Sequence, residues 1–148
     1  SVAEIKTGNP VTDVILTQKQ KEAEEKGIDF RCKFMYPTDT GINAFDVSVI
    51  LNNAITNAFE GVNGCKNPYV SVSAYRKKNA YMLELTNCVC KSVEIDDETG
   101  VPETTKKDKG SHGFGLANIR KVAQKYYGDI DISQDENSFT LTVMLMVE

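Results

Sequence analysis

The chain has 148 residues, of which 41% are hydrophobic and 26% charged, and its 17 basic and 21 acidic side chains leave a net charge of −4. This length suits a single domain, which buries enough surface to fold without a disulfide or a structural metal. The acidic balance argues against nucleic acids and anionic membranes as partners, because both require a basic surface.

The first half of the chain is predicted to alternate between helices and strands. Residues 12–26 form a charged helix that Gly27 can end, and its few apolar side chains suggest a packing partner outside the chain. Alternating apolar residues over 30–34 predict a half-buried strand. Apolar residues at helical spacing over 46–59 predict a second helix.

The second half begins with a predicted hairpin of two strands over 69–87. The polar stretch 88–112 has no periodicity, and segments of that length inside a domain are usually lids or binding loops. A third helix is expected over 116–127, followed by a closing hairpin over 130–147. This order of elements predicts an α+β protein: a two-layer sandwich with a mixed, mostly antiparallel sheet and helices on one face.

Four cysteines and a single histidine limit the metal and redox chemistry of the chain. Neither C-x-x-C nor zinc-type spacing occurs, and the C-x-C spacing of Cys88 and Cys90 makes a mutual disulfide awkward. Together with Cys32 and Cys65 they are interpreted as reduced, small apolar residues without a function. The lone His112 excludes metal sites built from several histidines.

Two asparagines four residues apart, Asn53 and Asn57, lie on one face of the second predicted helix. Asparagine is a mediocre helix former, so a stacked pair calls for an explanation. Their amides can face a ligand, and an amide oxygen suits a hard cation such as Mg²⁺. The alternative is an ordinary polar face of a surface helix.

The second motif is the segment 110–116, Gly-Ser-His-Gly-Phe-Gly-Leu, which leads into the third predicted helix. Glycines before a helix let backbone N–H groups converge on an anion such as a phosphate. The segment is neither a P-loop, which needs Lys-Ser/Thr after Gly115, nor a dinucleotide fingerprint, which needs a small residue at Asn118. A flexible hinge before a helix is the alternative.

In this order, the two motifs and the polar stretch between them resemble the GHKL superfamily of ATP-binding domains, which includes gyrases, heat-shock chaperones and histidine kinases. Residues 46–60 are similar to its N box, and residues 110–116 to its glycine box. The segments 7–10 (Thr-Gly-Asn-Pro) and 104–109 (Thr-Thr-Lys-Lys-Asp-Lys) are similar to sensor histidine kinases of the peptide-pheromone, quorum-sensing type. The resemblance implies a Bergerat-type ATP-binding fold that binds ATP and Mg²⁺.

The resemblance also implies roles for individual residues. Asn57 takes the position of the Mg²⁺ ligand, and Asn53 the position at which hydrolytic members carry a glutamate general base, so both are counted as catalytic. Since an amide cannot accept a proton at neutral pH, poor ATP hydrolysis is expected and an anti-sigma-type serine kinase is disfavoured. The expected nucleotide contacts are Asn53, Asn57, Asn87, Lys109, His112, Gly113, Phe114, Gly115 and Leu116.

The chain departs from the family pattern after its central strand. Most members carry Asp-x-Gly-x-Gly there, and the aspartate binds the adenine amino group, whereas this chain has Asn-Cys-Val-Cys beginning at Asn87. The amide oxygen of Asn87 can still accept that hydrogen bond. The same departure leaves a degenerate nucleotide-binding scaffold as an alternative function.

As the resemblance implies, the chain is the catalytic part of a protein-histidine kinase in a two-component system. Residues 1–27 are expected to be a helical stub next to an absent dimerisation domain, and residues 28–148 the ATP-binding domain. The γ-phosphate is expected to pass to a histidine on the dimerisation helices of the same receptor rather than to His112, with a response regulator as the further partner. The fragment alone is not expected to phosphorylate itself. The implied location is the cytoplasmic side of a membrane-anchored bacterial receptor, without direct membrane contact.

Overall fold

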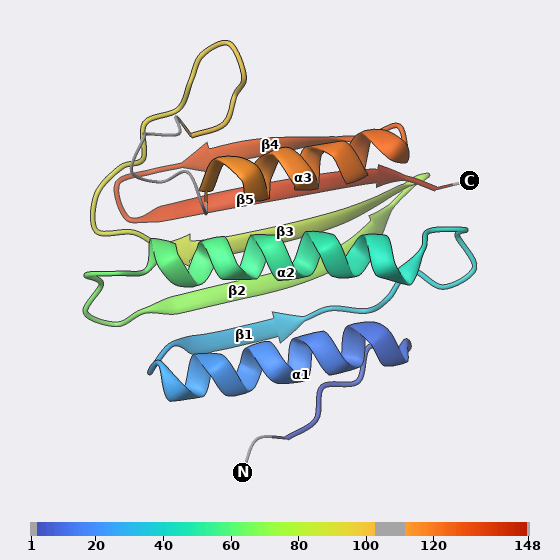
Figure 1. Cartoon of the computed structure of the whole chain (residues 1–148), viewed down its shortest axis with the longest axis horizontal. Coiled ribbons are helices and arrows are strands. Elements are labelled where there is room, and N and C mark those ends of the chain that lie inside the picture. Colours follow the sequence, from blue (N-terminus) through green and yellow to red (C-terminus); the bar gives the residue numbers. More distant parts are fainter. Residues whose placement is uncertain (1–2, 103–111, 148) are drawn as a thin grey trace.

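The computed structural model describes residues 3–102 and 112–147, and of residues 112–114 it describes the backbone alone. Within these ranges the helices are α1 (Pro10–Glu25), α2 (Ala44–Gly61) and α3 (His112–Lys125). The strands are β1 (Asp29–Lys33), β2 (Tyr69–Lys77), β3 (Ala80–Cys88), β4 (Asp129–Gln134) and β5 (Ser138–Met146). All the predicted helices and strands are present, and Figure 1 shows their arrangement.

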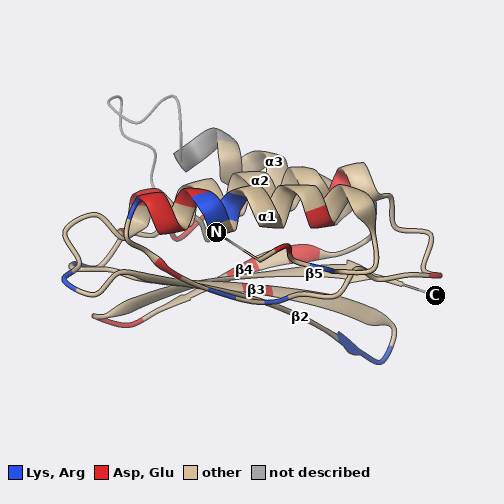
Figure 2. Cartoon of the chain, turned by 90° about the horizontal axis from the view of Figure 1, so that it is seen from below, with Lys and Arg blue, Asp and Glu red and all other residues tan. Residues whose placement is uncertain are grey.

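The strands form a five-stranded sheet in the order β1-β2-β3-β5-β4. β1 runs parallel to β2, and the other neighbours are antiparallel. The helices cover one face of this sheet, as Figure 2 shows. The structure therefore confirms the predicted α+β sandwich with a mixed, mostly antiparallel sheet.

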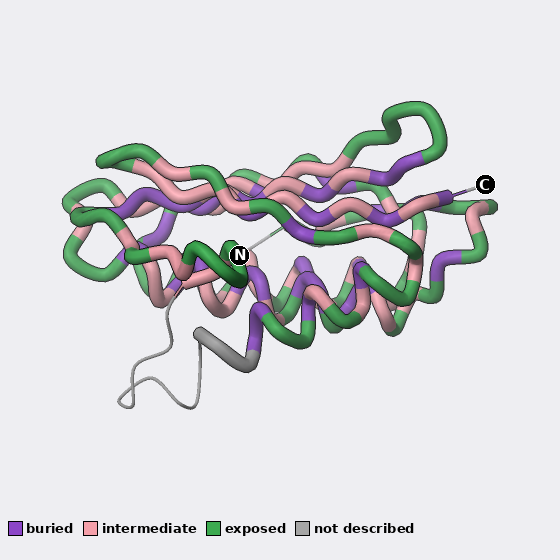
Figure 3. The backbone as a smooth tube through the Cα atoms, turned by 90° about the horizontal axis from the view of Figure 1, so that it is seen from above, coloured by how far each residue is buried: buried purple, intermediate pink, exposed green. Residues whose placement is uncertain are grey.

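The hydrophobic core lies between the sheet and the helix layer, where buried positions of both layers face each other (Figure 3). On β3, Leu83 and Leu85 are buried while Glu84 and Thr86 are more exposed, as the two-residue period of a strand requires. On α2, Leu51 and other apolar residues at helical spacing are fully buried. Each such side chain stabilises the fold by roughly 1.5–3 kcal/mol, so α2 is anchored along most of its length.

Helix α1 begins two residues earlier than predicted, because the Asn9 side chain caps it by accepting hydrogen bonds from the N–H groups of Val11 (2.9 Å) and Thr12 (3.3 Å). Leu16 and Ala23 of α1 are fully buried in the same core as α2 and the sheet. The buried face of α1 thus has its partner within the chain, whereas the sequence suggested a partner outside it.

The helices differ in direction. α1 and α2 run the same way, and α3 runs the opposite way, so α2 ends at the end of the molecule where α3 begins (Figure 1). In the described part of the chain, no helix combines the length and apolar character needed to cross a membrane.

Candidate functional site

A cavity of about 620 Å³ opens where α2 ends and α3 begins. It is bounded by α2, the first turns of α3, the strands β3 and β5, and parts of the segment 89–102 that follows β3. Binding sites for small molecules in proteins usually have about 300–1,000 Å³. The cavity is therefore large enough for a ligand of nucleotide size.

The sheet contributes an apolar floor to this cavity. Leu85 of β3 pairs with Leu141 of β5, and Asn87 pairs with Phe139, and all four residues line the cavity. An apolar surface with a single amide group suits a flat heterocycle that carries polar groups at its edge. Of these residues, the sequence motifs indicated only Asn87. For Leu85, Phe139 and Leu141, the alternation of apolar residues in the two strands was the only indication that they face the interior.

Asn57 of α2 meets Gly115 of α3 at the wall of the cavity. A Cβ atom added to Gly115 would lie 2.9 Å from Nδ2 and 3.3 Å from Oδ1 of Asn57, so the two residues touch and a larger residue at position 115 would have to displace the amide. Among the described residues, Asn57 Nδ2 is buried without a hydrogen-bond partner. A buried polar atom in that state is costly, which is typical of a site shaped for a ligand rather than for stability.

Asn87 makes a second close contact with a glycine. It is buried, its Nδ2 donates a hydrogen bond to the backbone oxygen of Cys88 (3.0 Å), and a Cβ on Gly61 would lie 2.6 Å from that nitrogen. The donor side of the amide is thus engaged by the protein, which leaves the oxygen of Asn87 as the acceptor for a ligand. Gly61 had no role in the sequence motifs. Because glycine has no Cβ, α2 can approach β3 closely at this point.

Asn53 does not join Asn57 in the cavity wall. Its Nδ2 donates a hydrogen bond to the backbone oxygen of Val49 (2.8 Å), one turn earlier on α2, and Asn53 is not among the residues that line the cavity. The helix face that the sequence predicted for the pair is correct, but the cavity begins only at the turn that carries Ala54 and Asn57.

The described part of the glycine motif is helical, which the sequence did not predict. α3 begins at His112 rather than near Leu116, so Gly113 and Gly115 belong to its first turns and do not precede it. The reason is tertiary packing: contact with Asn57 outweighs the low helix propensity of glycine. Leu116 is buried and lines the cavity.

Other predicted nucleotide contacts are described incompletely. Lys109 lies outside the described residues, as does the rest of segment 103–111. His112, Gly113 and Phe114 are described only as backbone of α3. Their roles remain predictions.

Part of the stretch predicted as a lid is held in place by side chains from β4 and α3. Gln134 accepts a hydrogen bond from the N–H of Val93 (3.0 Å) and donates one to the oxygen of the same residue (2.6 Å). Arg120 donates to the backbone oxygen of Thr99 (2.8 Å) and forms an ion pair with Asp129 (3.2 Å). Val93 thereby becomes a fixed part of the cavity wall, a role that no sequence pattern indicated.

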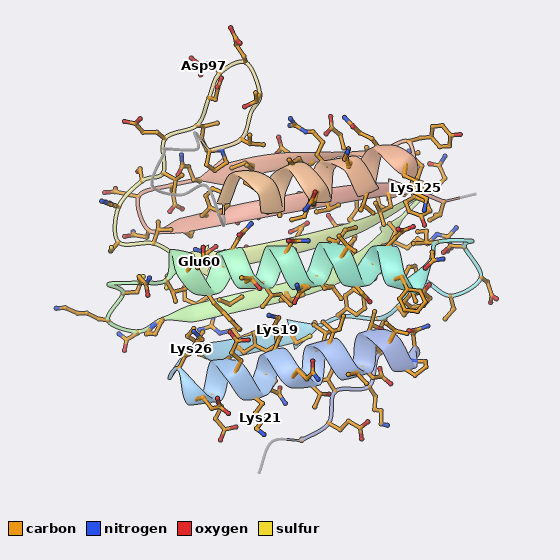
Figure 4. All side chains as sticks on the ribbon, viewed as in Figure 1. Lys19, Lys21, Lys26, Glu60, Asp97 and Lys125 are labelled. Carbon is orange, nitrogen blue, oxygen red and sulfur yellow. The ribbon has the colours of Figure 1, made fainter. Side chains whose placement is uncertain are left out.

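The charged side chains that line the described cavity are Glu60, Glu94 and Lys91. Figure 4 shows Glu60 at the end of α2 that borders the cavity. The amide of Asn57 and the carboxylate of Glu60 are hard oxygen donors on neighbouring turns of one helix. Mg²⁺ takes few protein ligands of this kind and keeps several waters, so the donor set fits this metal.

Comparison with solved structures shows the same fold in sensor kinases. The nucleotide-free catalytic domain of histidine kinase ThkA has a TM-score of 0.73 at 17% identity, over 99% of this chain and 97% of that chain. The mycobacterial sensor histidine kinase MprB has a TM-score of 0.65 at 15% identity, over 93% and 94%. A histidine kinase from Burkholderia phymatum has a TM-score of 0.68 at 13% identity, over 96% and 69%.

Comparison of the sequence itself gives two results. No curated protein matches the chain. The family model described as the GHKL domain matches residues 42–146, a span that contains α2, α3 and every element that borders the cavity. The chain is therefore a member of the GHKL domain family.

Proposed function

We propose that this chain is the ATP-binding catalytic domain of a protein-histidine kinase. The observation that carries the proposal is the contact between Asn57 and Gly115, which joins the N box to the glycine box at the wall of one cavity. A polar helix face or a glycine hinge would each explain one motif, but neither explains why the two motifs meet beside an apolar floor.

Each part of Mg²⁺·ATP has a suitable surface in this cavity. The adenine ring contacts Leu85 and Leu141, and the oxygen of Asn87 accepts a hydrogen bond from its amino group. The phosphates face the first turn of α3, whose backbone N–H groups have no partner within the helix. The amide oxygen of Asn57 would hold Mg²⁺, which would neutralise phosphate charge.

The phosphoryl group passes to an acceptor outside the described residues. At the position of the hydrolytic glutamate the chain carries Asn53, which has no basic lone pair at neutral pH and whose amide is bound to Val49. Water is therefore poorly activated, as suits a kinase. ThkA and MprB are histidine kinases, which favours a histidine as acceptor.

The same proposal extends to the partners and the location of the domain. The acceptor histidine lies on dimerisation helices of the same receptor, to which residues 1–27 lead, and a response regulator receives the phosphate. The segments 7–10 and 104–109 support a membrane-anchored, quorum-sensing receptor of the peptide-pheromone type, with this domain in the cytoplasm.

Titration calorimetry with ATP in the presence of Mg²⁺ tests the proposal. We expect Asn57→Ala to weaken binding by at least about tenfold, the range in which loss of one metal-site group usually falls. The melting temperature should stay the same or rise, because the substitution removes a buried, unpartnered amide. The matched control is Asn52→Ala, which removes an exposed amide from the same helix. Equal affinities of Asn57→Ala and the unchanged protein would contradict the proposal.

A degenerate scaffold is the second candidate, and the observation that favours it is the sequence Asn-Cys-Val-Cys in place of Asp-x-Gly-x-Gly at Asn87. Absence of heat with either ATP or ADP plus Mg²⁺ would favour the scaffold. If binding occurs, labelled ATP and a separate histidine-bearing dimerisation helix distinguish the kinases, since phosphohistidine is acid-labile and phosphoserine is not.

A further inference from the structure

Three of the four cysteines gather at one end of the sheet, beside the cavity. Cys88 ends β3, Cys90 follows two residues later, and Cys65 lies in the segment that joins α2 to β2. The antiparallel pairing of β2 with β3 brings the start of β2 beside Cys88, whose Sγ accepts a hydrogen bond from the N–H of Tyr69 (3.4 Å). The connection before β2 thus carries Cys65 back to the end of β3.

Both cysteines of the C-x-C sequence, Cys88 and Cys90, lie near Cys65 or the turn that carries it. The thiol of Cys88 lies close enough to Cys65 to raise the pKa of that residue. The Sγ of Cys90 lies 3.0 Å from the place that a Cβ on Gly64 would take, and it donates a hydrogen bond to the backbone oxygen of Asn63 (3.4 Å). Cys90 therefore packs directly against the turn that carries Cys65.

The three thiols differ in their access to solvent. Cys90 is exposed, Cys65 is partly exposed and Cys88 is buried. Burial, reinforced by the thiols of Cys88 and Cys90, raises the pKa of Cys65 to about 11, so Cys65 is protonated at neutral pH. Among these three thiols, Cys90 is therefore the most accessible to an oxidant in solution.

We propose that Cys65 and Cys90 form a reversible disulfide when the protein meets hydrogen peroxide. The sulfur of Cys90 first attacks one peroxide oxygen, which breaks the O–O bond and gives a sulfenic acid and water. The thiol of Cys65 then loses its proton as its sulfur attacks the sulfenic sulfur, and the displaced hydroxyl takes up a proton and leaves as a second water. In total the two thiols lose two electrons and two protons, which reduce one peroxide to two waters.

The disulfide would alter the nucleotide site by moving Val89, which lies between Cys88 and Cys90. Val89 lines the cavity, and its N–H donates a hydrogen bond to the backbone oxygen of Asn137 (3.0 Å). Closing a sulfur–sulfur bond of about 2.05 Å draws Cys90 toward the turn of Cys65 and displaces Val89 with it. This consequence rests on the proposed function, whereas the bond itself does not. Reversible disulfides of this kind in reducing compartments usually sense redox state.

Mass spectrometry of the peroxide-treated protein tests the bond. We expect the intact protein to lose the mass of two hydrogens, a thiol reductant to restore it, and peptide mapping to join Cys65 to Cys90. No loss of mass, or a bridge that joins any other pair, would overturn the proposal.

Serine substitutions provide the controls. Cys65→Ser and Cys90→Ser should each abolish the bridge. Cys32→Ser, on β1, should leave it intact, and so should Cys88→Ser, whose hydroxyl can still accept from Tyr69. A bridge that persists in Cys65→Ser, or one that disappears in Cys32→Ser, would contradict the assignment.

Calorimetry of the reduced and oxidised forms tests the effect on the site. The oxidised protein should bind Mg²⁺·ATP about tenfold more weakly, and the reductant should restore the affinity. Equal affinities would overturn the coupling to the cavity. Failure of the reduced protein to bind ATP would count against the proposed function instead, while the bridge found by mass spectrometry would stand.

Discussion

At the scale of single residues, Asn57 and Gly115 depend on each other. Any other residue at position 115 would place its Cβ 2.9 Å from the amide nitrogen, which is buried without a hydrogen-bond partner in the described part of the chain. The same arrangement is unfavourable for stability and useful for binding, because a buried amide that makes few protein contacts is available to a ligand.

Gly115→Ala separates these two effects. Alanine favours a helix over glycine by roughly 0.5–1 kcal/mol, which offsets part of the clash, so the melting temperature should change little. The new Cβ would lie 2.9 Å from Asn57 Nδ2 and push the amide aside, so affinity for Mg²⁺·ATP should fall by about tenfold. If calorimetry finds an unchanged affinity, binding of Mg²⁺·ATP does not depend on the position of the Asn57 amide.

At the scale of elements, the wall of the cavity is fixed by long-range tethers rather than by regular structure. Gln134 binds both backbone groups of Val93, as a neighbouring strand would, and Arg120 holds Thr99 while it pairs with Asp129. The segment from β3 to residue 102 therefore borders the cavity because β4 and α3 hold it there.

Gln134→Ala should release Val93 from the wall. Loss of two hydrogen bonds should reduce the free energy of unfolding by about 1–3 kcal/mol, at roughly 0.5–1.5 kcal/mol each. Hydrogen exchange at the Val93 amide should become faster, and ATP affinity should fall. Gln124→Ala, at an exposed position on α3, is the matched control. Exchange at Val93 that stays slow would show that other contacts hold this wall.

At the scale of the whole molecule, the end opposite the cavity ties the start of α2 to the end of α3. Lys125 forms an ion pair with Asp46 (2.8 Å), and Tyr126 donates a hydrogen bond to the same carboxylate and accepts one from the N–H of Asn43 (3.0 Å). Figure 4 shows Lys125 at this end and Glu60 at the other. The two helices that border the cavity are thus joined at their far ends.

This cluster predicts how stability depends on pH. Burial alone would raise the pKa of Asp46, but hydrogen bonds from Lys125 and Tyr126 outweigh it and hold the pKa below the ordinary 3.8. The contribution is therefore complete above pH 3.8 and is lost as the pH falls toward the lower folded-state value. Asp46→Asn should be less stable than the unchanged protein at neutral pH, and the difference should shrink below pH 3.8. Asp97→Asn, in an exposed loop, should show no such pH dependence.

Much of the fold could be predicted because its signals are local. Helical spacing over 46–59 and strand alternation over 69–87 are properties of short windows, and both elements are present. The predicted start of α3 was four residues too late, because glycine has a low helix propensity, whereas in the folded chain Gly113 and Gly115 are helical and Gly115 packs against Asn57.

Part of the site could be predicted from the sequence. Helical spacing and the glycine motif singled out Asn57 and Gly115, and the family resemblance assigned them, with Asn87 and Leu116, as nucleotide contacts. The structure places Asn57, Asn87 and Leu116 at the cavity, with Gly115 against Asn57. The positions of Lys91 and Gln134 near the cavity depend on which segments the sheet order brings together. The same is true of the three thiols that lie close to one another. No short window of sequence contains that information, so these features became visible only in the folded chain.

The opposite directions of α2 and α3 have an electrostatic consequence. The aligned peptide groups of a helix place about half an elementary charge at each end, negative at the C-terminus and positive at the N-terminus. α2 presents its negative end to the cavity and α3 its positive end, so a field crosses the space between them. A bound metal–phosphate complex would be oriented by this field, with its cation toward α2 and its anionic oxygens toward α3. Because the field arises from the backbone, no substitution of a single wall side chain removes it.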